Sequence, residues 1–356
     1  MRSPAPTIRA TSSKSDISGA TLIEKPLASL CAMRTLVTGA TGKVGFATAR
    51  TLLDAGHEVR ALVRDPARAV LPDGAEPVVG DVTAPDTLGA ACDGCEVVFN
   101  AMGLPEQWLA DEALFQRVNV DGTTAVVQAA IAAGARRVVH TSTIDVFDAD
   151  PHGVLRETQL SSTPKDTAYE RSKQRAEAAA IAAAGDAVEL VMVNPAAVYG
   201  PGPTGSASTE EAFIRPVVLG RRREVPFAPP GGLGMVFSDG IGAGQLLAAE
   251  RGVPGERYIL CDGGLTMVEL AELAVRVAGR GSVPPALPAA AAEAIAGLGA
   301  LVSRVTKRPP LLPRGQLTFL RWNARPDSSK AQRELGWSPT PLEEGMRRTL
   351  ADLGLI

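Results

Sequence analysis

A phenol and an ammonium group stand one helical turn apart in this chain. Tyr169 and Lys173 fall in a stretch, 168–184, whose residue pattern is helical, so both side chains share one face of the predicted helix. A free phenol, with a pKa of about 10, is a poor acid–base catalyst at neutral pH, but a neighbouring positive charge favours the phenolate. Thr143, just after a predicted strand at 137–141, adds a hydroxyl that can hold a reacting oxygen. Together these residues indicate acid–base chemistry.

A glycine-rich loop, TGATGKVG at 38–45, lies between a predicted strand and a predicted helix. Its three glycines allow a tight turn, close approach to a pyrophosphate and packing of the helix on the sheet, while the helix amino terminus offers N–H donors to the anion. A second predicted strand follows about 20 residues later, as a dinucleotide site requires. The loop residues expected to bind the cofactor are Gly39, Thr41, Gly42, Lys43, Val44 and Gly45.

The end of the second predicted strand indicates which dinucleotide is bound. An acidic residue there would bind the ribose 2′-hydroxyl of NAD(H), but the chain has Arg64 at this end and Lys43 in the loop. Two cations favour a 2′-phosphate, hence NADP(H), with NAD(H) as the alternative. The competing interpretation is that Asp65 forms a solvated ion pair with Arg68. The segment Asp81–Val82, after the third strand, is expected to contact the adenine end of the cofactor.

Strands and helices alternate along the chain from Met33 onward. This alternation predicts an α/β fold, a Rossmann-type doubly wound parallel sheet. After Tyr199 the pattern becomes irregular, so we expect a dinucleotide-binding core at 33–200 and, at 201–356, mainly a smaller carboxyl-terminal substrate-binding lobe with segments returning to the core. The strands are expected at 35–38, 58–63, 76–79, 97–100, 137–141 and 188–193, and the helices at 44–55, 87–92, 108–134 and 168–184.

Composition excludes several other classes of function. The chain of 356 residues is 45% hydrophobic and 21% charged with a net charge of −3, which is typical of a soluble globular protein and gives no strong field for nucleic acid. Three His and four Cys are too few for a disulfide framework or a multi-metal site, and we expect no metal. The pair Cys92 and Cys95 has the CxxC spacing, but no second pair accompanies it, so we interpret it as coincidence.

Residues 1–32 differ from the rest of the chain. They are rich in Ser, Thr and Pro and carry four basic residues against two acidic ones. We expect a disordered leader, or translation that starts at Met33 instead of Met1; a transit peptide is the alternative. The protein is therefore expected in the cytoplasm, or in an organelle if this leader is a transit peptide.

The motifs together resemble those of the extended short-chain dehydrogenase/reductases, the NAD-dependent epimerase/dehydratase superfamily. The resemblance extends from Met33 nearly to the end of the chain. Its pieces are TGATGKVG at 38–45, GDV at 80–82, NVDGT at 119–123, TST at 141–143, YERSK at 169–173, NP at 194–195 and YGPG at 199–202.

The resemblance implies a role for each matching residue. Tyr169 would be the acid–base group, Lys173 would lower its pKa and hold the nicotinamide ribose, and Thr143 would orient the substrate oxygen, with Ser142 as the alternative hydroxyl. Asn119 would organise a proton relay; the competing interpretation is a polar group bonded to backbone inside a helix. The segment Asn194–Pro195 would also contact the cofactor.

Within the superfamily the chain is most similar to dihydroflavonol-reductase-like and 3β-hydroxysteroid-dehydrogenase-like members. Sugar-nucleotide epimerases usually carry Arg where this chain has Asn194. The chain departs from the family pattern in two places: FSDGI at 237–241 leaves the start of a helix open, and Asn100 replaces a common His.

Two features bear on the substrate and partners. The apolar stretch 286–302, with Glu293 as its one charge, is expected to form a buried or pocket-capping helix; a helix lying on a membrane surface is the alternative, and we expect no membrane span. Arg221–Arg223 is either a clamp for a nucleotide diphosphate or a solvated loop. The family resemblance implies that this chain can form a homodimer, with an interface made by the helices at 108–134 and 168–184.

The predicted function is therefore an NADP(H)-dependent oxidoreductase that interconverts a ketone or aldehyde and an alcohol on a mostly apolar small molecule. The alternative is a sugar-nucleotide epimerase or dehydratase that uses NAD(P) transiently. A non-catalytic dinucleotide sensor is a third hypothesis, which the intact set Thr143, Tyr169 and Lys173 disfavours.

Overall fold

The structure is a computed structural model that describes residues 32–150, 152–203, 208–306, 310, 312, 317 and 324–356. The predicted leader, except for its last residue, lies outside the described residues. The description below concerns residues 32–356, which form one compact unit.

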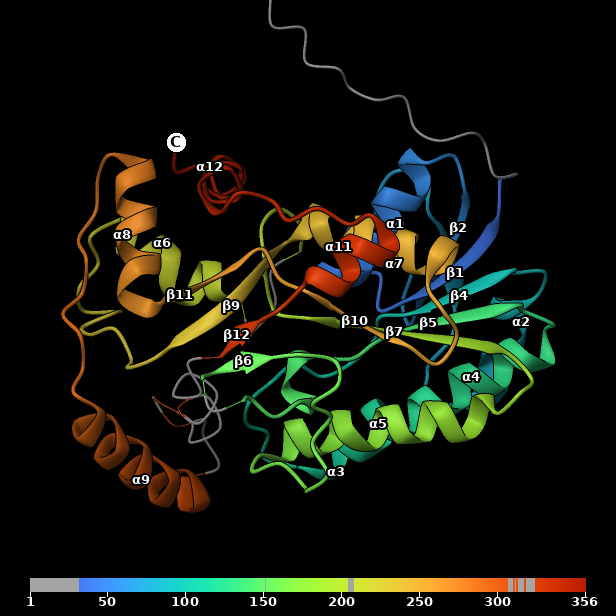
Figure 1. The fold of residues 1–356 in the computed structure, drawn as a ribbon, viewed down its shortest axis with the longest axis horizontal. Coiled ribbons are helices and arrows are strands. Elements are labelled where there is room, and N and C mark those ends of the chain that lie inside the picture. The colour runs from blue at the N-terminus through green and yellow to red at the C-terminus, as the bar shows by residue number, and fades with distance from the viewer. Residues whose placement is uncertain are drawn as a thin grey trace, which may run out of the picture. The chain divides into compact units, whose positions relative to one another are not determined.

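Seven strands of the described chain form one parallel sheet in the order β10-β7-β5-β4-β1-β2-β3 (Figure 1). The chain runs outward in one direction from β1 to β3 and in the other from β4 to β10, so the sheet is doubly wound and its switch point lies between β1 and β4. The expected Rossmann-type α/β fold is confirmed. The strands are β1 (Arg34–Thr38), β2 (Glu58–Val63), β3 (Glu76–Val79), β4 (Val97–Asn100), β5 (Arg137–Thr141), β7 (Glu189–Pro195) and β10 (Arg257–Leu260).

Helices cover both faces of this sheet (Figure 1). One face packs against α1 (Lys43–Asp54), α7 (Ser238–Arg251) and α11 (Ser329–Leu335), and the other against α2 (Gly89–Cys92), α4 (Gly122–Ala132) and α5 (Ala168–Ala184). The central strands β4 and β5 are buried along their whole length, because helices exclude water from both sides of a parallel sheet. This arrangement leaves the carboxyl ends of the strands as the edge where loops gather.

The helix predicted at 108–134 starts later than expected and is not regular. It begins with α3 (Ala113–Phe115), continues as a π-helical turn (Gln116–Asp121) and only then becomes α4. The sequence before Ala113 is therefore loop. The wider turn holds Asn119, and π-helical turns of this kind are frequent at functional sites.

A second, smaller core lies beyond the large sheet. It is built on a three-stranded sheet of β8 (Ala197–Tyr199), β9 (Gly232–Phe237) and β11 (Gly263–Thr266). The helices α6 (Arg215–Val218), α8 (Met267–Ala278) and α12 (Leu342–Asp352) contribute to this core. A short pair, β6 (Val154–Leu155) with β12 (Arg325–Pro326), completes the strands of the described chain.

The apolar stretch 286–302 forms most of α9 (Ala289–Thr306), which stands apart in Figure 1. It buries small side chains, Ala292 and Ala296, but Leu298 is 66% exposed and Leu301 is 60% exposed. The expectation of a buried helix is therefore wrong for this face. None of the described helices is long and apolar enough to cross a membrane.

Candidate active site

The glycine loop has the shape that a pyrophosphate requires. Gly39 adopts a positive φ of 69°, and a Cβ there would lie 2.8 Å from the carbonyl oxygen of Ala101. A Cβ at Gly45 would collide with the carbonyl of Gly39. Helix α1 starts at Lys43 behind Gly42, and among the described residues no side chain caps its first N–H groups. These donors are free to bind an anion, so the loop fits a dinucleotide.

The two cations predicted to bind a 2′-phosphate, Arg64 and Lys43, have different surroundings. Arg64 is exposed at the end of β2, and its charge helps to lower the pKa of Asp81, for which the main cause is a hydrogen bond from the Thr83 N–H. Lys43 instead donates to Glu210 Oε1 at 2.6 Å and to the Gly200 carbonyl oxygen at 2.5 Å. In the described structure Lys43 is therefore held by the chain itself. Its contact with a ribose stays a prediction.

The ion pair between Asp65 and Arg68, the competing interpretation, is not formed among the described residues. No ion pair joins these two residues in the described part of the chain, and Asp65 accepts the N–H of Ala67 at 3.0 Å instead. Asp81 also turns inward on its own loop, where Thr83 donates to it from both backbone and hydroxyl at 2.8 Å. Arg64 and Arg68 are both exposed cations of this corner, and Arg64 is the one at the end of β2.

Tyr169 and Thr143 meet at the carboxyl edge of β5. The Thr143 hydroxyl lies beside the phenol and acts to lower the pKa of Tyr169. Thr143 Oγ1 donates to Asp145 Oδ2 at 3.0 Å. Ser142 is buried too, but its Oγ has no hydrogen-bond partner among the described residues. Of the two hydroxyls that the sequence left open, the structure therefore brings Thr143 to the phenol.

Lys173 is buried one turn along α5, where Nζ donates to the Thr141 carbonyl oxygen at 2.8 Å. Burial lowers the pKa of Lys173 to about 8, against the opposing charges of Glu177 and Asp145. Burial also raises the pKa of Tyr169, and the charge of Asp145 raises it further. The Thr143 hydroxyl opposes these two effects on the Tyr169 pKa. The expected lowering of that pKa by Lys173 stays a prediction.

Asn119 connects the π-helical turn to both sides of the site. Its amide Nδ2 donates to Ser172 Oγ at 2.9 Å, and its Oδ1 accepts the Leu104 N–H at 2.8 Å. A Cβ on Gly103 would lie 3.5 Å from that Oδ1 and 3.9 Å from Lys173 Nζ. One side of the candidate site is thus formed by three neighbouring residues, Asn119, Gly103 and Lys173. The relay role of Asn119 stays a prediction.

Asn194 lies beneath the site instead of on its surface. Its Nδ2 donates to the Thr143 carbonyl oxygen at 3.0 Å and to Glu177 Oε1 at 2.9 Å, and the side chain is fully buried. It therefore holds the Thr143 loop against α5. A direct contact of Asn194 or Pro195 with the cofactor stays a prediction.

Sequence reasoning missed several polar groups that support the site. Thr38, Asn100 and His140 form a hydrogen-bonded row across β1, β4 and β5. Gln245 of α7 donates to Thr141 Oγ1 at 2.7 Å. Their signal in the sequence is weak, since each is one polar residue at the end of an apolar run or inside a glycine-rich segment.

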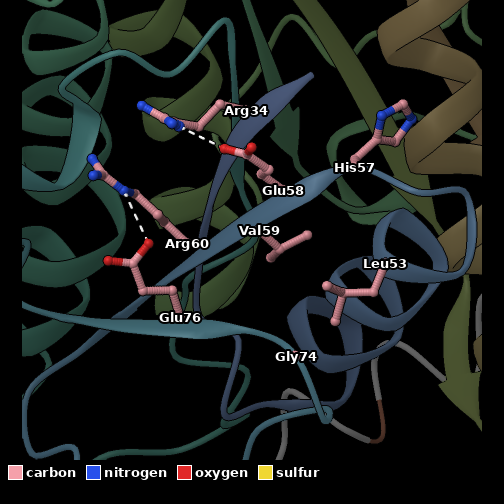
Figure 2. A pocket seen from close by; sticks show the side chains of 8 residues that line it. All are labelled: Arg34, Leu53, His57, Glu58, Val59, Arg60, Gly74 and Glu76. Carbon is pink, nitrogen blue, oxygen red and sulfur yellow. Dashed lines mark hydrogen bonds and ion pairs between the residues drawn. The ribbon is translucent and has the colours of Figure 1, made fainter. Parts of the chain in front are cut away.

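A pocket on the opposite edge of the sheet shares none of the predicted site residues. It lies at the amino ends of β1, β2 and β3, where Arg34 faces Glu58 and Arg60 faces Glu76 (Figure 2). These charges are paired, and Arg60 also donates to the Asp93 carbonyl oxygen at 2.7 Å. The charges of this pocket are therefore paired, although Arg60 Nε donates no hydrogen bond to the described residues.

The remaining candidate features carry little chemistry. Cys92 and Cys95 are free and buried, and burial raises the pKa of both thiols, that of Cys92 to about 12. No cluster of His, Cys, Asp and Glu suited to a metal ion occurs among the described residues. Arg221–Arg223 is exposed, with Arg221 paired to Glu224 and Arg222 bonded to Ser282.

Residues 35–232 match the NAD dependent epimerase/dehydratase family. The chain belongs to this family. It is 33% identical over 324 residues to sterol demethylase protein B of Methylococcus capsulatus, covering 86% of this chain and 94% of that protein. It is 30% identical over 329 residues to a putative dihydroflavonol 4-reductase of Synechocystis, covering 87% and 91%.

A third relative of this family member is a ketoreductase of Stigmatella aurantiaca. That protein is named for 4-hydroxy-2-methyl-3-oxo-4-farnesyl-3,4-dihydroquinoline-1-oxide, and the identity is 33% over 317 residues, covering 86% of this chain and 92% of the relative. Among solved structures, gox2253 superposes with a TM-score of 0.72 at 28% identity, covering 90% of this chain and 97% of that one. The protein is thus an NAD(P)-dependent short-chain dehydrogenase/reductase of the extended type, similar to the dihydroflavonol reductase and 3β-hydroxysteroid dehydrogenase branch.

Proposed function

We propose that the protein is an NADP(H)-dependent reductase that interconverts a ketone or aldehyde and an alcohol on a mostly apolar small molecule. The observation that carries this proposal is the half-buried phenol of Tyr169 beside the buried Thr143 and Lys173, at the same sheet edge as the glycine loop. A protonated phenol at the carboxyl edge of the sheet of a dinucleotide fold is suited to proton transfer to an oxygen.

The cofactor would be held by the glycine loop, whose free N–H groups face the pyrophosphate, and by the exposed Arg64. Arginine matches a phosphate with two hydrogen bonds, which supports NADP(H) over NAD(H). When bound, the nicotinamide supplies or accepts the hydride. Lys173 would hold its ribose, as the family resemblance implies.

Side chains of the protein would supply and accept the proton that accompanies hydride transfer. Tyr169 gives its phenolic proton to the carbonyl oxygen in reduction and recovers one from the alcohol in oxidation. Thr143 orients the same oxygen by its hydroxyl. Asn119 keeps the turn before α4 against Ser172, one residue from Lys173, and so fixes the ammonium group in place.

The choice of an apolar substrate rests on the cations of the second lobe. Arg215 is paired with Glu211, and Arg221 with Glu224, so neither is an uncommitted partner for a diphosphate. A buried diphosphate needs several cations to replace its hydration. Two of the relatives above are named for a sterol and for a farnesylated ketone, which supports an apolar carbonyl substrate for this chain as well.

The test is a cofactor assay with two classes of substrate. We expect steady loss of NADPH absorbance with hydrophobic ketones or aldehydes, and weak calorimetric binding of UDP-glucose. Micromolar binding of UDP-glucose that Arg222→Ala abolishes, with turnover but no net change in the cofactor, would establish the epimerase instead. A homodimer through α4 and α5 and a cytoplasmic location also stay predictions.

A further inference from the structure

A buried carboxyl group lies directly behind the proposed hydroxyl pair. Asp145 is 3% exposed, in the short 3-10 turn Ile144–Val146 that follows β5. Its Oδ2 accepts the Thr143 hydroxyl at 3.0 Å, while its Oδ1 has no hydrogen-bond partner among the described residues. A buried carboxylate that is only half satisfied costs free energy. Such a cost is common where the group has a functional role.

The charged groups around Asp145 come from each element packed against it. Glu170 and Lys173 face it from α5, Lys165 faces it from the segment before α5, and the Tyr169 phenol lies on the far side of Thr143. Burial and the charge of Glu170 raise the pKa of Asp145 to about 7, against the Thr143 hydrogen bond and the two lysines. The carboxyl group therefore changes its charge within the physiological range of pH.

We propose that Asp145 is a positioning residue for proton transfer, which acts through Thr143 and keeps the Tyr169 phenol protonated. The inference rests on the proposed function, in which Tyr169 is the acid–base group. A hydroxyl has one proton to donate. In the protein without substrate, the Thr143 hydroxyl donates its hydrogen bond to the Asp145 carboxylate. Its oxygen then faces Tyr169 as an acceptor, and the phenol stays protonated.

The charge of Asp145 acts in the same direction as this hydrogen bond. A nearby negative charge disfavours the phenolate, and Glu170 and Glu106 add to the effect. Ionised Asp145 therefore favours Tyr169 as the acid of carbonyl reduction. Neutral Asp145 releases the Thr143 proton to face the phenol oxygen and favours Tyr169 as the base of alcohol oxidation.

Direct titration of the phenol tests this inference without any substrate. The chain has only three tyrosines, so ζ-carbon-13-labelled tyrosine gives a simple NMR spectrum, which Tyr169→Phe assigns. Asp145→Asn keeps the shape and removes the charge. We expect the apparent pKa of Tyr169 to fall by about one unit or more in Asp145→Asn. The alkaline limb of kcat/KM for alcohol oxidation should move the same way.

A matched control is Asp262→Asn. Asp262 is another carboxyl group whose pKa burial raises, to about 6, but it accepts the N–H groups of Phe237 and Thr340 and does not contact Tyr169. This variant should leave the titration of Tyr169 unchanged. An equal shift in both variants would mean a general effect of loosened packing and would overturn the inference.

A second measurement needs no variant at Asp145. In the unmodified protein the Tyr169 signal should show a small step centred near pH 7, as Asp145 ionises, and Thr143→Val should weaken this step. A flat signal through that range overturns the inference, as does an unmoved phenol in Asp145→Asn. If Tyr169→Phe retains full turnover, the proposed function fails instead, so the two failures are distinguishable.

Discussion

The two edges of the large sheet treat their charged groups in opposite ways. At the amino edge, Arg34 pairs with Glu58 and Arg60 with Glu76, and the glutamates of both pairs are largely exposed (Figure 2). At the carboxyl edge, Asp145 and Lys173 are buried, and each has a pKa displaced toward neutrality. The same sheet thus presents inert charge at one edge and adjustable charge at the other.

The difference follows from the solvent that each group has lost. Exposed ion pairs stay hydrated, so forming or removing one changes the free energy of unfolding little. Buried groups lose their hydrogen bonds to water, and the protein does not replace all of them. Oδ1 of Asp145, Oγ of Ser142 and Nε2 of His140 have no hydrogen-bond partner among the described residues. Burial and Lys173 also hold the pKa of His140 well below its usual value. Asp145 and Lys173, whose pKa values are displaced toward neutrality, lie close to Tyr169 and Thr143, and such a cluster is typical of a functional site.

The largest expected effect is at the phenol of the carboxyl edge. Tyr169→Phe removes only the transferable proton, while the ring still packs edge-on against Phe115 at a centroid distance of 6.3 Å. Turnover should fall about 10²-fold or more, with the affinity for cofactor changed by a small factor. Steady-state rates and cofactor titration check this. Turnover within a few-fold of the parent would show that the phenol is not the acid–base group.

The exposed Arg64 at the carboxyl edge should affect which cofactor is bound. Arg64→Asp places a carboxylate where a ribose hydroxyl could be accepted and a 2′-phosphate is repelled. We expect the ratio of NADPH to NADH affinity to fall about 10-fold or more, with binding retained. Fluorescence titration with both cofactors measures it. Equal changes in the affinities for NADPH and NADH would show that Arg64 does not lie near the ribose of the cofactor.

The buried carboxylate should cost stability in a pH-dependent way. Because the folded pKa of Asp145 lies near 7, above its unfolded value, the folded state binds more protons between about pH 4 and 7 and loses stability as pH rises through that range. Asp145→Asn should therefore raise the melting temperature at pH 8 by a few degrees and by less at pH 5. A difference that is constant with pH would contradict this account.

The smallest effect is expected at the amino edge. Glu58→Gln removes the partner of Arg34, but 64% of the Glu58 side chain is exposed. The melting temperature should change by about 1 °C or less, and turnover should not change. Scanning calorimetry and the reductase assay check both. A fall in melting temperature or turnover as large as that from a buried residue would show that the two edges do not differ in this way.

Sequence predicted the core strands and the glycine loop closely. Strands such as Val97–Asn100 are short apolar runs with clear ends, and α5 starts at the Thr167 and Glu170 capping box. The helix α7 was not predicted, because it carries Gly240, Gly242 and Gly244. A Cβ at Gly242 would lie 2.7 Å from the Ala47 carbonyl oxygen, so close packing on α1, and not apolar periodicity, fixes those residues.

The candidate site was predicted in its sequence motifs but not in its surroundings. Tyr169, Lys173 and Thr143 have a recognisable spacing and lie together as expected. Asp145 was not singled out, because a lone carboxylate in sequence gives no sign that the chain will bury it. Only the packing of α5 against the turn after β5 makes it a neighbour of the phenol.

Transfer of deuterium from labelled cofactor tests the central claim most directly. NADPH carrying deuterium at the nicotinamide C4 would be incubated with a hydrophobic ketone, and the product analysed by mass spectrometry and NMR. The account predicts one deuterium at the carbinol carbon, one NADPH consumed for each alcohol formed, and neither in Tyr169→Phe. Turnover of a nucleotide-sugar with no net loss of NADPH, and no reduction of any ketone, would contradict it.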